Sequence, residues 1–118
     1  MTGMNGAGRA RPGLKRFDVL LVRLDPVEGS EIAKTRPCAV VSPDELSGPL
    51  RTVLVAPMTT ASKAYPFRVV CHFRGRDGFI AVDQIRCIDR SRIVRRLGAL
   101  SPVTRGRLLE TLQEFFAP

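Results

Sequence analysis

Two short stretches of polar side chains stand next to apolar runs and hold most of the chain's candidate chemistry. The first stretch, Ser30 to Arg36, precedes the apolar run CAVV, and the second, Thr59 to Tyr65, follows the run RTVLVAP. An arginine offers a permanently charged, forked donor that matches a phosphate, and a threonine hydroxyl can add a hydrogen bond to a phosphoryl oxygen. Arg36 and Thr59 together could therefore stabilise the extra negative charge of a pentavalent phosphorus.

Pro37 restricts the backbone next to the first of these residues. A residue that precedes proline is disfavoured in the helical region, so we expect Arg36 in extended backbone at the entrance of a strand. If the strands on either side are neighbours, the two polar stretches meet at one end of the fold. A plainer interpretation stays open, in which Arg36 is a strand-edge residue and MTTAS is a hydroxyl-rich turn. Spacing alone favours this plainer interpretation.

Other chemistries find little support among the residues. The single histidine, His72, stands between apolar neighbours, and we interpret it as a structural or surface residue. No His, Cys and Asp residues have metal-ligand spacing, and no glycine-rich phosphate loop is present. Cys38, Cys71 and Cys87 lack a CxxC spacing and fall within expected strands, so we interpret them as reduced core thiols. We therefore expect no metal and no other cofactor.

The charge of the chain is strongly positive and unevenly distributed. Nineteen Lys and Arg against eleven Asp and Glu give a net charge of +8. Residues 51–107 carry twelve basic and three acidic side chains, a local +9, whereas residues 17–50 carry three basic and six acidic ones, a local −3. This imbalance fits a polyanionic partner for part of the surface, and a solvated, arginine-rich surface is the alternative interpretation.

Short strand-like runs separated by turn signals dominate the chain from Phe17 onward. We expect strands at 17–24, 38–42, 51–57 and 67–73, one helical turn within 43–50, and one bent or two short strands over 79–89. The sequence RGRDG predicts a hairpin turn with Asp77-Gly78 at its apex.

The last segment of the chain changes to a helical period. Ser101 is the expected N-cap of a helix, and Pro102 suits its first position. The apolar residues at helical spacing are Leu108, Leu109, Leu112, Phe115 and Phe116. Five or more short strands closed by one C-terminal helix predict a mainly β fold, a compact and partly open β-barrel. We expect residues 17–118 to form this single domain and residues 1–16 to form a flexible basic arm.

Neither a membrane segment nor a secretory signal is expected. No apolar run reaches the ~18 residues that a membrane helix requires. The N-terminal stretch MTGMNGAGRARPGLKR has basic residues but lacks an apolar h-region. We therefore expect a cytoplasmic protein with no membrane partner.

Five motifs in order along the chain resemble those of the MazF/PemK (Kid-like) toxins of bacterial type II toxin–antitoxin modules. They are DVLLVRLDPVEGSE, KTRPCAVVSP, VLVAPMTTASKAYPF, RDGFIAVDQIRCID and LGALSP. RP and TT pairs occur by chance, but five such motifs with similar spacings form a specific signal. The resemblance extends from about Phe17 to Ala117, which leaves only the expected basic arm outside it.

The resemblance implies a plug-like, SH3-type barrel that works as a homodimer. It also implies a sequence-specific, metal-independent endoribonuclease in which a ribose 2′-OH of single-stranded RNA attacks the adjacent phosphorus. On this basis the arginine of the RP motif is Arg36, the catalytic threonine is Thr59, and the acidic residue of the GSE motif is Glu31. We expect RNA contacts from Ser30, Lys34, Thr60, Ser62, Lys63 and Gln84.

The physically simplest roles for these residues follow from their charge. An arginine stays protonated at neutral pH, so Arg36 would stabilise charge, while Thr59 would bond a non-bridging oxygen. Glu31 is then a candidate to receive the 2′-OH proton. The Kid-like branch has an Arg and an Asp on the strand that aligns with AVDQ, where this chain has Ala81 and Asp83. The missing arginine favours a MazF-like arrangement and a structural role for Asp83.

Two alternatives to the ribonuclease use the same barrel. One is a non-catalytic toxin that resembles the gyrase-poisoning relatives, against which the intact RP and TT motifs argue. The other is a plain RNA-binding domain, which the local +9 charge would suit. In the toxin interpretations we expect an antitoxin partner with an acidic, disordered tail that complements the positive surface.

Overall fold

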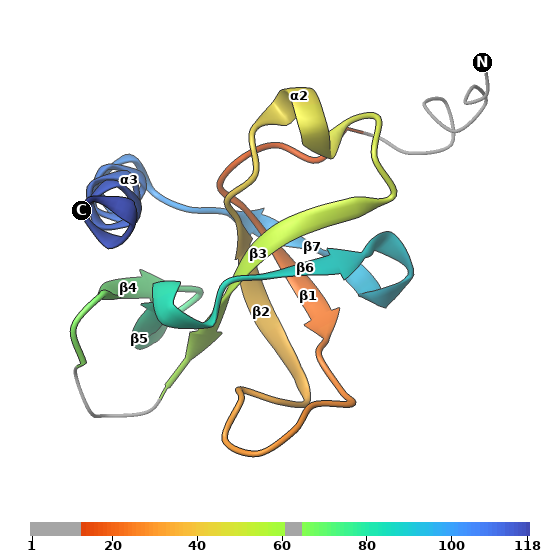
Figure 1. Ribbon diagram of the computed structural model, residues 1–118, viewed down its shortest axis with the longest axis horizontal. Helices are drawn as coiled ribbons and strands as arrows, with labels where there is room; N and C mark the ends of the chain where they lie inside the picture. The colour runs from red at the N-terminus through yellow and green to blue at the C-terminus, as the bar shows by residue number, and fades with distance from the viewer. Residues whose placement is uncertain (1–12, 61–64) are drawn as a thin grey trace.

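The computed structural model describes residues 13–60 and 65–118, and within them one sheet with a helix along its side (Figure 1). The strands are β1 (Asp18–Arg23), β2 (Thr35–Val40), β3 (Thr52–Thr59), β4 (Arg68–Phe73), β5 (Arg76–Ala81), β6 (Arg86–Asp89) and β7 (Ile93–Ala99). Their order is β4-β5-β3-β2-β1-β7, with β6 paired to β3. Two helices complete the fold, α2 (Asp44–Ser47) and α3 (Pro102–Phe116). The expectation of a mainly β, barrel-like fold closed by one C-terminal helix is confirmed.

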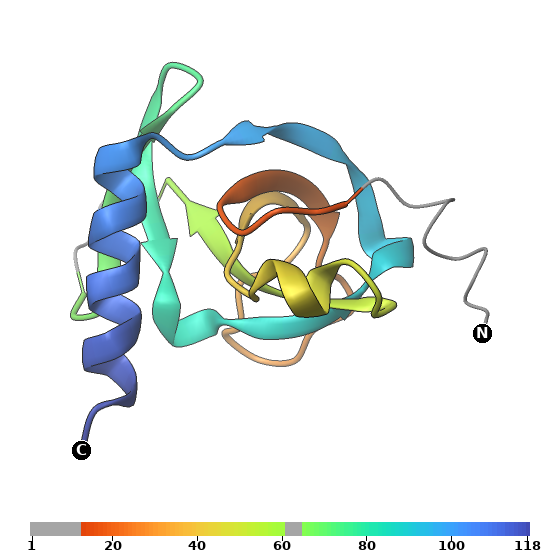
Figure 2. The ribbon, with the colours of Figure 1, turned by 90° about the horizontal axis from the view of Figure 1, so that it is seen from above.

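Strand β3 joins the two parts of the sheet because it pairs with three partners. Its first half, Thr52 to Val55, pairs with β6, while its last residues, Met58 and Thr59, pair with β5. Strand β2 pairs along its other edge. Seen from above, β6 and β7 curve around β1–β3, and α3 runs in front of β4 and alongside β5 (Figure 2). Thr59, the last residue of β3, therefore lies in the part of that strand that pairs with β5.

Strands β1–β3 are buried on both faces, which explains why their sequences are continuous apolar runs. The first core cluster is Val19, Ala39, Val41, Ala56, Met58, Val69, Cys71, Ile80, Val82, Leu100 and Leu108. The second core cluster is Leu20, Val22, Leu24, Cys38, Val40, Val53, Val55 and Ile88. Successive residues alternate between the two clusters, as Val19 and Leu20 do on β1. The central strands are thereby fixed in register, which a site built on them requires.

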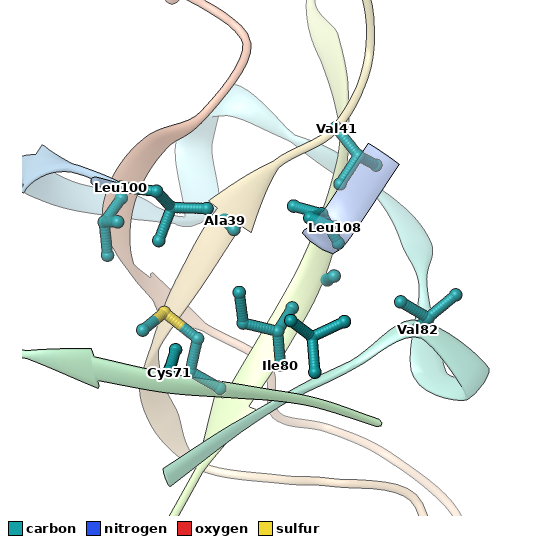
Figure 3. Packing of buried hydrophobic residues seen from close by; sticks show 11 residues of the cluster. Ala39, Val41, Cys71, Ile80, Val82, Leu100 and Leu108 are labelled. Carbon is teal, nitrogen blue, oxygen red and sulfur yellow. The ribbon is translucent and has the colours of Figure 1, made fainter. Parts of the chain in front are cut away.

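Helix α3 covers the first core cluster and begins where the sequence predicts. The Ser101 Oγ accepts a hydrogen bond from the Thr104 backbone N–H (3.3 Å), and Pro102 is the first helical residue. Leu108 is fully buried and reaches into the first core cluster from the helix (Figure 3). By contrast, Leu109 and Phe116 remain exposed, so the described monomer covers only part of the apolar face.

The β4–β5 turn differs from the expected one. Phe73 pairs with Arg76, so the connection is Arg74-Gly75, and both residues have positive φ (52° and 79°). Two consecutive residues with positive φ are the signature of a two-residue hairpin turn that matches the twist of the strands. The prediction of Asp77-Gly78 as apex is wrong, because these residues belong to β5.

Two further expectations need correction, and two are confirmed. The sequence does not predict strand β7, because Arg95 and Arg96 interrupt its apolar pattern. Strand β7 lies at the edge of the sheet, where charged side chains can be exposed. Cys87 is exposed on β6 rather than in the core, whereas Cys38 and Cys71 are buried. Burial raises the pKa of the Cys38 thiol to about 12. The helical turn at α2 and the division of residues 79–89 into two strands are confirmed.

The described part of the N-terminal stretch contacts the barrel. Leu14 packs against the second core cluster, and the Arg16 Nε donates to the carbonyl oxygen of Val41 (3.1 Å). Residues 1–12 lie outside the described residues, so the flexible arm stays a prediction. In the described ranges, no helix combines the length and apolar character needed to span a membrane.

Candidate active site

One cavity brings Arg36 and Thr59 together. It has a volume of about 230 Å³ and lies between the start of β2, the end of β3 and the β4–β5 hairpin. Its lining residues are Thr35, Arg36, Pro37, Met58, Thr59, Thr60, Cys71, Phe73, Arg76, Asp77 and Gly78. We call this space the Arg36–Thr59 cavity. The two polar stretches that the sequence analysis singled out thus meet at one end of the fold.

The register of β2 against β3 accounts for this meeting. Cys38 pairs with Pro57. Arg36 lies two residues before Cys38 on β2, and Thr59 lies two residues after Pro57 on the antiparallel β3. Because side chains alternate along each strand, Arg36 and Thr59 project to the same side of the sheet. The β-branched, apolar run of β3 fixes this register because its residues fill both core clusters.

Arg36 is held in place while part of its guanidinium stays available. Its Nε donates to the carbonyl oxygen of Ala33 (2.7 Å), and the side chain is half-buried. Within residues 13–60 and 65–118, neither Nη group has a protein acceptor in hydrogen-bond range. A guanidinium fixed through Nε can point both Nη groups at a ligand oxygen pair without losing further side-chain freedom.

Glycine at position 78 lets β5 approach the backbone of Thr59. A Cβ atom placed on Gly78 would lie 2.4 Å from the Thr59 carbonyl oxygen, which is far inside van der Waals contact. Thr59 itself pairs with Phe79. Gly78 is therefore part of what positions Thr59, and sequence reasoning missed it by assigning the residue to a turn. A glycine inside a strand pattern is a signal of close backbone approach that could have revealed it.

Glu31 lies in a different cavity from Arg36 and Thr59. This second space, the Glu31 cavity, has a volume of about 200 Å³ and is also lined by Arg86 and Arg92. The Glu31 Oε1 accepts a hydrogen bond from the backbone N–H of Glu28 (2.8 Å), which folds the carboxylate back onto its own loop. The structure therefore brings two of the three expected catalytic residues together and leaves the third apart.

Gln84 and Arg86 hold the loop that carries Glu31. The Gln84 Oε1 accepts from the Ile32 backbone N–H (3.3 Å) and from the Arg86 Nη2 (3.0 Å). The Arg86 Nη1 in turn donates to the Ile32 carbonyl oxygen (3.1 Å). The backbone N–H and C=O of Ile32 are thus both satisfied from β6 and the residues before it. Gln84, an expected RNA contact, uses its amide oxygen to anchor the loop, and Arg86 is a positioning residue that the sequence did not reveal.

The remaining expected RNA contacts divide by position. Thr60 is exposed and lines the Arg36–Thr59 cavity, whereas Ser30 and Lys34 are exposed on the 24–34 loop and do not line it. Lys34 has a positive φ of 68°, and its backbone N–H donates to the Asp25 Oδ1 (3.0 Å). Ser62 and Lys63 lie outside the described residues.

Asp83 forms an ion pair away from this cavity. The Arg68 Nε and Nη2 donate to its two carboxylate oxygens at 2.9 and 3.0 Å. This hydrogen bonding holds the pKa of the Asp83 carboxyl below its ordinary value of 3.8 and raises the pKa of Arg68. Arg68 on β4 pairs across the strands with Ala81 on β5. The arrangement agrees with a structural role for Asp83.

His72 forms a surface pair with Asp77. The His72 Nδ1 lies 2.6 Å from the Asp77 Oδ1, and both side chains are exposed. His72 and Asp77 are direct partners in the β4–β5 ladder, as Cys71 and Gly78 are. Because side chains alternate along a strand, the pair projects to the face opposite the buried Cys71. The interpretation of His72 as a surface residue is consistent with this position.

Comparisons with known proteins identify the family. Over residues 15–116 the chain matches the family described as PemK-like, MazF-like toxin of type II toxin–antitoxin system. It is 40% identical over 86 residues to the endoribonuclease toxin MazF of Escherichia coli K12, covering 72% of this chain and 78% of that protein. It is 31% identical over 110 residues to endoribonuclease MazF9 of Mycobacterium tuberculosis, covering 85% and 93%.

Solved structures show the same fold. A crystal structure of MazF from Deinococcus radiodurans superimposes with a TM-score of 0.78 at 24% identity, covering 89% of this chain and 97% of that one. A mycobacterial endoribonuclease in complex with its cognate antitoxin superimposes with a TM-score of 0.72 at 19% identity, covering 86% and 92%. The chain belongs to the family of PemK-like, MazF-like toxins of type II toxin–antitoxin systems.

Proposed function

We propose that this protein is a cytoplasmic toxin that cleaves single-stranded RNA at specific sequences without a metal ion and so inhibits translation and growth. The observation that carries the proposal is the convergence of Arg36 and Thr59 in one cavity, from the two motifs that match the family. Relatives that are 40% and 31% identical to this chain over 86 and 110 aligned residues are named endoribonucleases.

The proposed reaction is an internal transfer at phosphorus. The ribose 2′-oxygen bonds to the adjacent phosphorus, the bond to the 5′-oxygen breaks, and the products are a 2′,3′-cyclic phosphate and a 5′-OH. One proton leaves the 2′-OH, and one is delivered to the 5′-oxygen. Arg36 stabilises the charge that builds on the phosphoryl oxygens, while Thr59 donates to a non-bridging oxygen. Preorganised donors of this kind cost no rearrangement when the charge develops.

The proton acceptor for the 2′-OH remains part of the proposal. Glu31 is our candidate, and its position in the Glu31 cavity requires that the loop before β2 carries it towards Arg36 when RNA binds. The hydrogen bond from Glu28 to Glu31 and the clamp on Ile32 would have to open in this movement. A general base has to come within hydrogen-bond reach of the proton that it removes.

The main test is cleavage of RNA by purified protein in excess EDTA, followed by mapping of the 5′ ends of the fragments. Arg36→Ala and Thr59→Ala should each lose cleavage and keep the thermal midpoint of the parent. Thr52→Ala, at the exposed start of the same strand, is the matched control and should cleave normally. Cleavage that survives both site substitutions would remove the site assignment. Inhibition of gyrase supercoiling without RNA products would instead indicate a non-catalytic toxin.

We also propose that the protein works as a homodimer and is silenced by an antitoxin with an acidic, disordered tail. A groove of about 370 Å³ between α2, β3, β6 and α3 is bordered by Leu46, Leu50 and Phe116, all largely exposed, which a second copy would cover. The net charge of +8 supports an acidic partner, and a MazE–MazF complex is among the similar structures. Light scattering should give the mass of a dimer, and Leu50→Lys should reduce it to that of a monomer.

A further inference from the structure

The β4–β5 hairpin contributes a second arginine to the Arg36–Thr59 cavity. Arg76 lines this cavity, as do Phe73 and Gly78 from the same hairpin. The actual turn at Arg74-Gly75 makes Arg76 the first residue of β5 and pairs it directly with Phe73. This placement depends on the register of the hairpin, which differs from the one expected from the sequence.

The strand register decides which way Arg76 projects. Direct partners in an antiparallel ladder place their side chains on the same face. Phe73 packs against the first core cluster, so Arg76 leaves the strand on that same face, at the rim of the cavity. Asp77, the next residue, projects to the opposite face and pairs there with His72. Asp77 also lines the cavity, but its Oδ1 is already paired with the His72 Nδ1.

Arg76 also differs from most other arginines in how its guanidinium is used. Hydrogen bonds or ion pairs engage Arg16, Arg23, Arg36, Arg51, Arg68, Arg86, Arg90, Arg92, Arg96 and Arg105. Within the described ranges the exposed Arg76 side chain has no such partner. Much of the positive charge is thus tied to carbonyl and carboxylate oxygens of the fold, and Arg76 is a charge that stays available at the cavity.

We propose that Arg76 binds a backbone phosphate of the single-stranded RNA whose scissile phosphate lies at Arg36 and Thr59. The inference rests on the proposed function, because it assigns a further contact to that same site. A guanidinium can donate two parallel hydrogen bonds to two oxygens of one phosphate. Contacts of this kind fix the position of the RNA on the protein without reading its sequence. Arg76 is therefore a positioning residue that holds the neighbouring nucleotide while Arg36 acts at the reacting one.

The binding test uses Arg76→Ala and Arg74→Ala with a short, mixed-sequence 2′-O-methyl RNA, which cannot be cleaved through its 2′-oxygen. Both substitutions remove one positive charge from the same hairpin, but Arg74 does not line the cavity. Binding weakens as salt rises, so the slope of log K against log salt is negative. Loss of one phosphate contact on a single strand should make this slope shallower by about 0.7. We expect this decrease for Arg76→Ala alone, and Arg76→Lys should restore the slope.

The cleavage test separates positioning from catalysis. Arg76→Ala should raise KM roughly tenfold and leave kcat near that of the parent, because the phosphate contact is made equally in ground and transition states. Equal behaviour of Arg76→Ala and Arg74→Ala in both assays would overturn the proposal. An altered cleavage sequence with an unchanged salt slope would also overturn it, in favour of a base contact.

The two proposals can fail separately. If the parent protein does not cleave RNA, the proposed function fails, while the difference in salt slope between Arg76→Ala and Arg74→Ala still tests the phosphate contact. If the parent cleaves and Arg36→Ala does not, but Arg76→Ala matches its control, only the Arg76 assignment fails. Thermal midpoints of all variants should agree, since both arginines are exposed and outside the core clusters.

Discussion

The Arg36–Thr59 cavity and the Glu31 cavity use polar side chains in opposite ways. In the first, strands in fixed register present guanidinium and hydroxyl groups around an open space, and the Nη groups of Arg36 have no acceptor within the described ranges. Beside the second, the polar groups bond to one another: Gln84 accepts from the Ile32 backbone N–H, and Arg86 donates to the Ile32 carbonyl oxygen. Residues that the sequence assigns to one site therefore serve two purposes: some are placed to contact a ligand, and others support a loop.

The largest expected effect is at the wall of the first cavity. Gly78→Ala places a Cβ against the Thr59 carbonyl oxygen and forces β5 away from β3. Because a displaced donor loses its alignment with the phosphoryl oxygen, kcat should fall about a hundredfold, as for loss of one preorganised donor. The measurement is single-turnover cleavage of RNA at saturating protein.

A second glycine provides the control for this substitution. Gly106 lies in α3, and a Cβ placed there meets nothing within 4 Å. Gly106→Ala should stabilise the helix by up to about 1 kcal/mol and leave kcat unchanged. If Gly78→Ala cleaves RNA as fast as Gly106→Ala, the close approach of β5 does not position Thr59.

The next effect tests whether the two cavities work together. If the loop before β2 brings Glu31 to the 2′-OH, Glu31→Gln should lower kcat by about a hundredfold, the usual range for loss of a general base. Glu28→Gln is the matched control, since Glu28 bonds to Glu31 through its backbone and its exposed side chain should not matter. Normal cleavage by Glu31→Gln would show that the two cavities are functionally separate.

A moderate effect on stability should follow from opening the clamp. Arg86→Met removes the donors to Ile32 and Gln84, leaves part-buried acceptors unsatisfied, and should lower the free energy of unfolding by about 1–3 kcal/mol. Arg95→Met, an exposed change on β7, should shift it by less than about 0.5 kcal/mol. Urea denaturation measures the free energy of unfolding of both variants. Equal losses in Arg86→Met and Arg95→Met would show that the clamp does not support the loop.

The smallest effect concerns the ion pair outside both cavities. Arg68 holds the pKa of Asp83 below its ordinary value of 3.8, so the folded state binds a proton there less readily than the unfolded state. The stabilisation is therefore fully present above that value and is lost as pH falls through the lower pKa of the folded state. Asp83→Asn should cost less than about 1 kcal/mol at neutral pH, and its difference from the parent should vanish in strong acid. A difference that persists there contradicts this ion-pair account.

Local sequence chemistry was sufficient for much of the fold. The apolar runs of β1–β3 predicted strands because each residue there enters one of two core clusters. Ser101 and Pro102 predicted the start of α3 because capping depends only on residues within one helical turn. Strand β7 and the exposed Cys87 were missed because edge position and face are set by pairing with distant strands.

The sequence by itself determined which residues could do chemistry, since Arg36 and Thr59 follow from residue type, neighbouring prolines and the family motifs. Only the tertiary structure decided which of them share a cavity. It joined Arg36 to Thr59 through the register of β2 and β3, added Arg76 and Gly78 through a hairpin turn three residues earlier than expected, and set Glu31 apart. The physical reason is that long-range pairing and twist, rather than local composition, fix the distances between side chains.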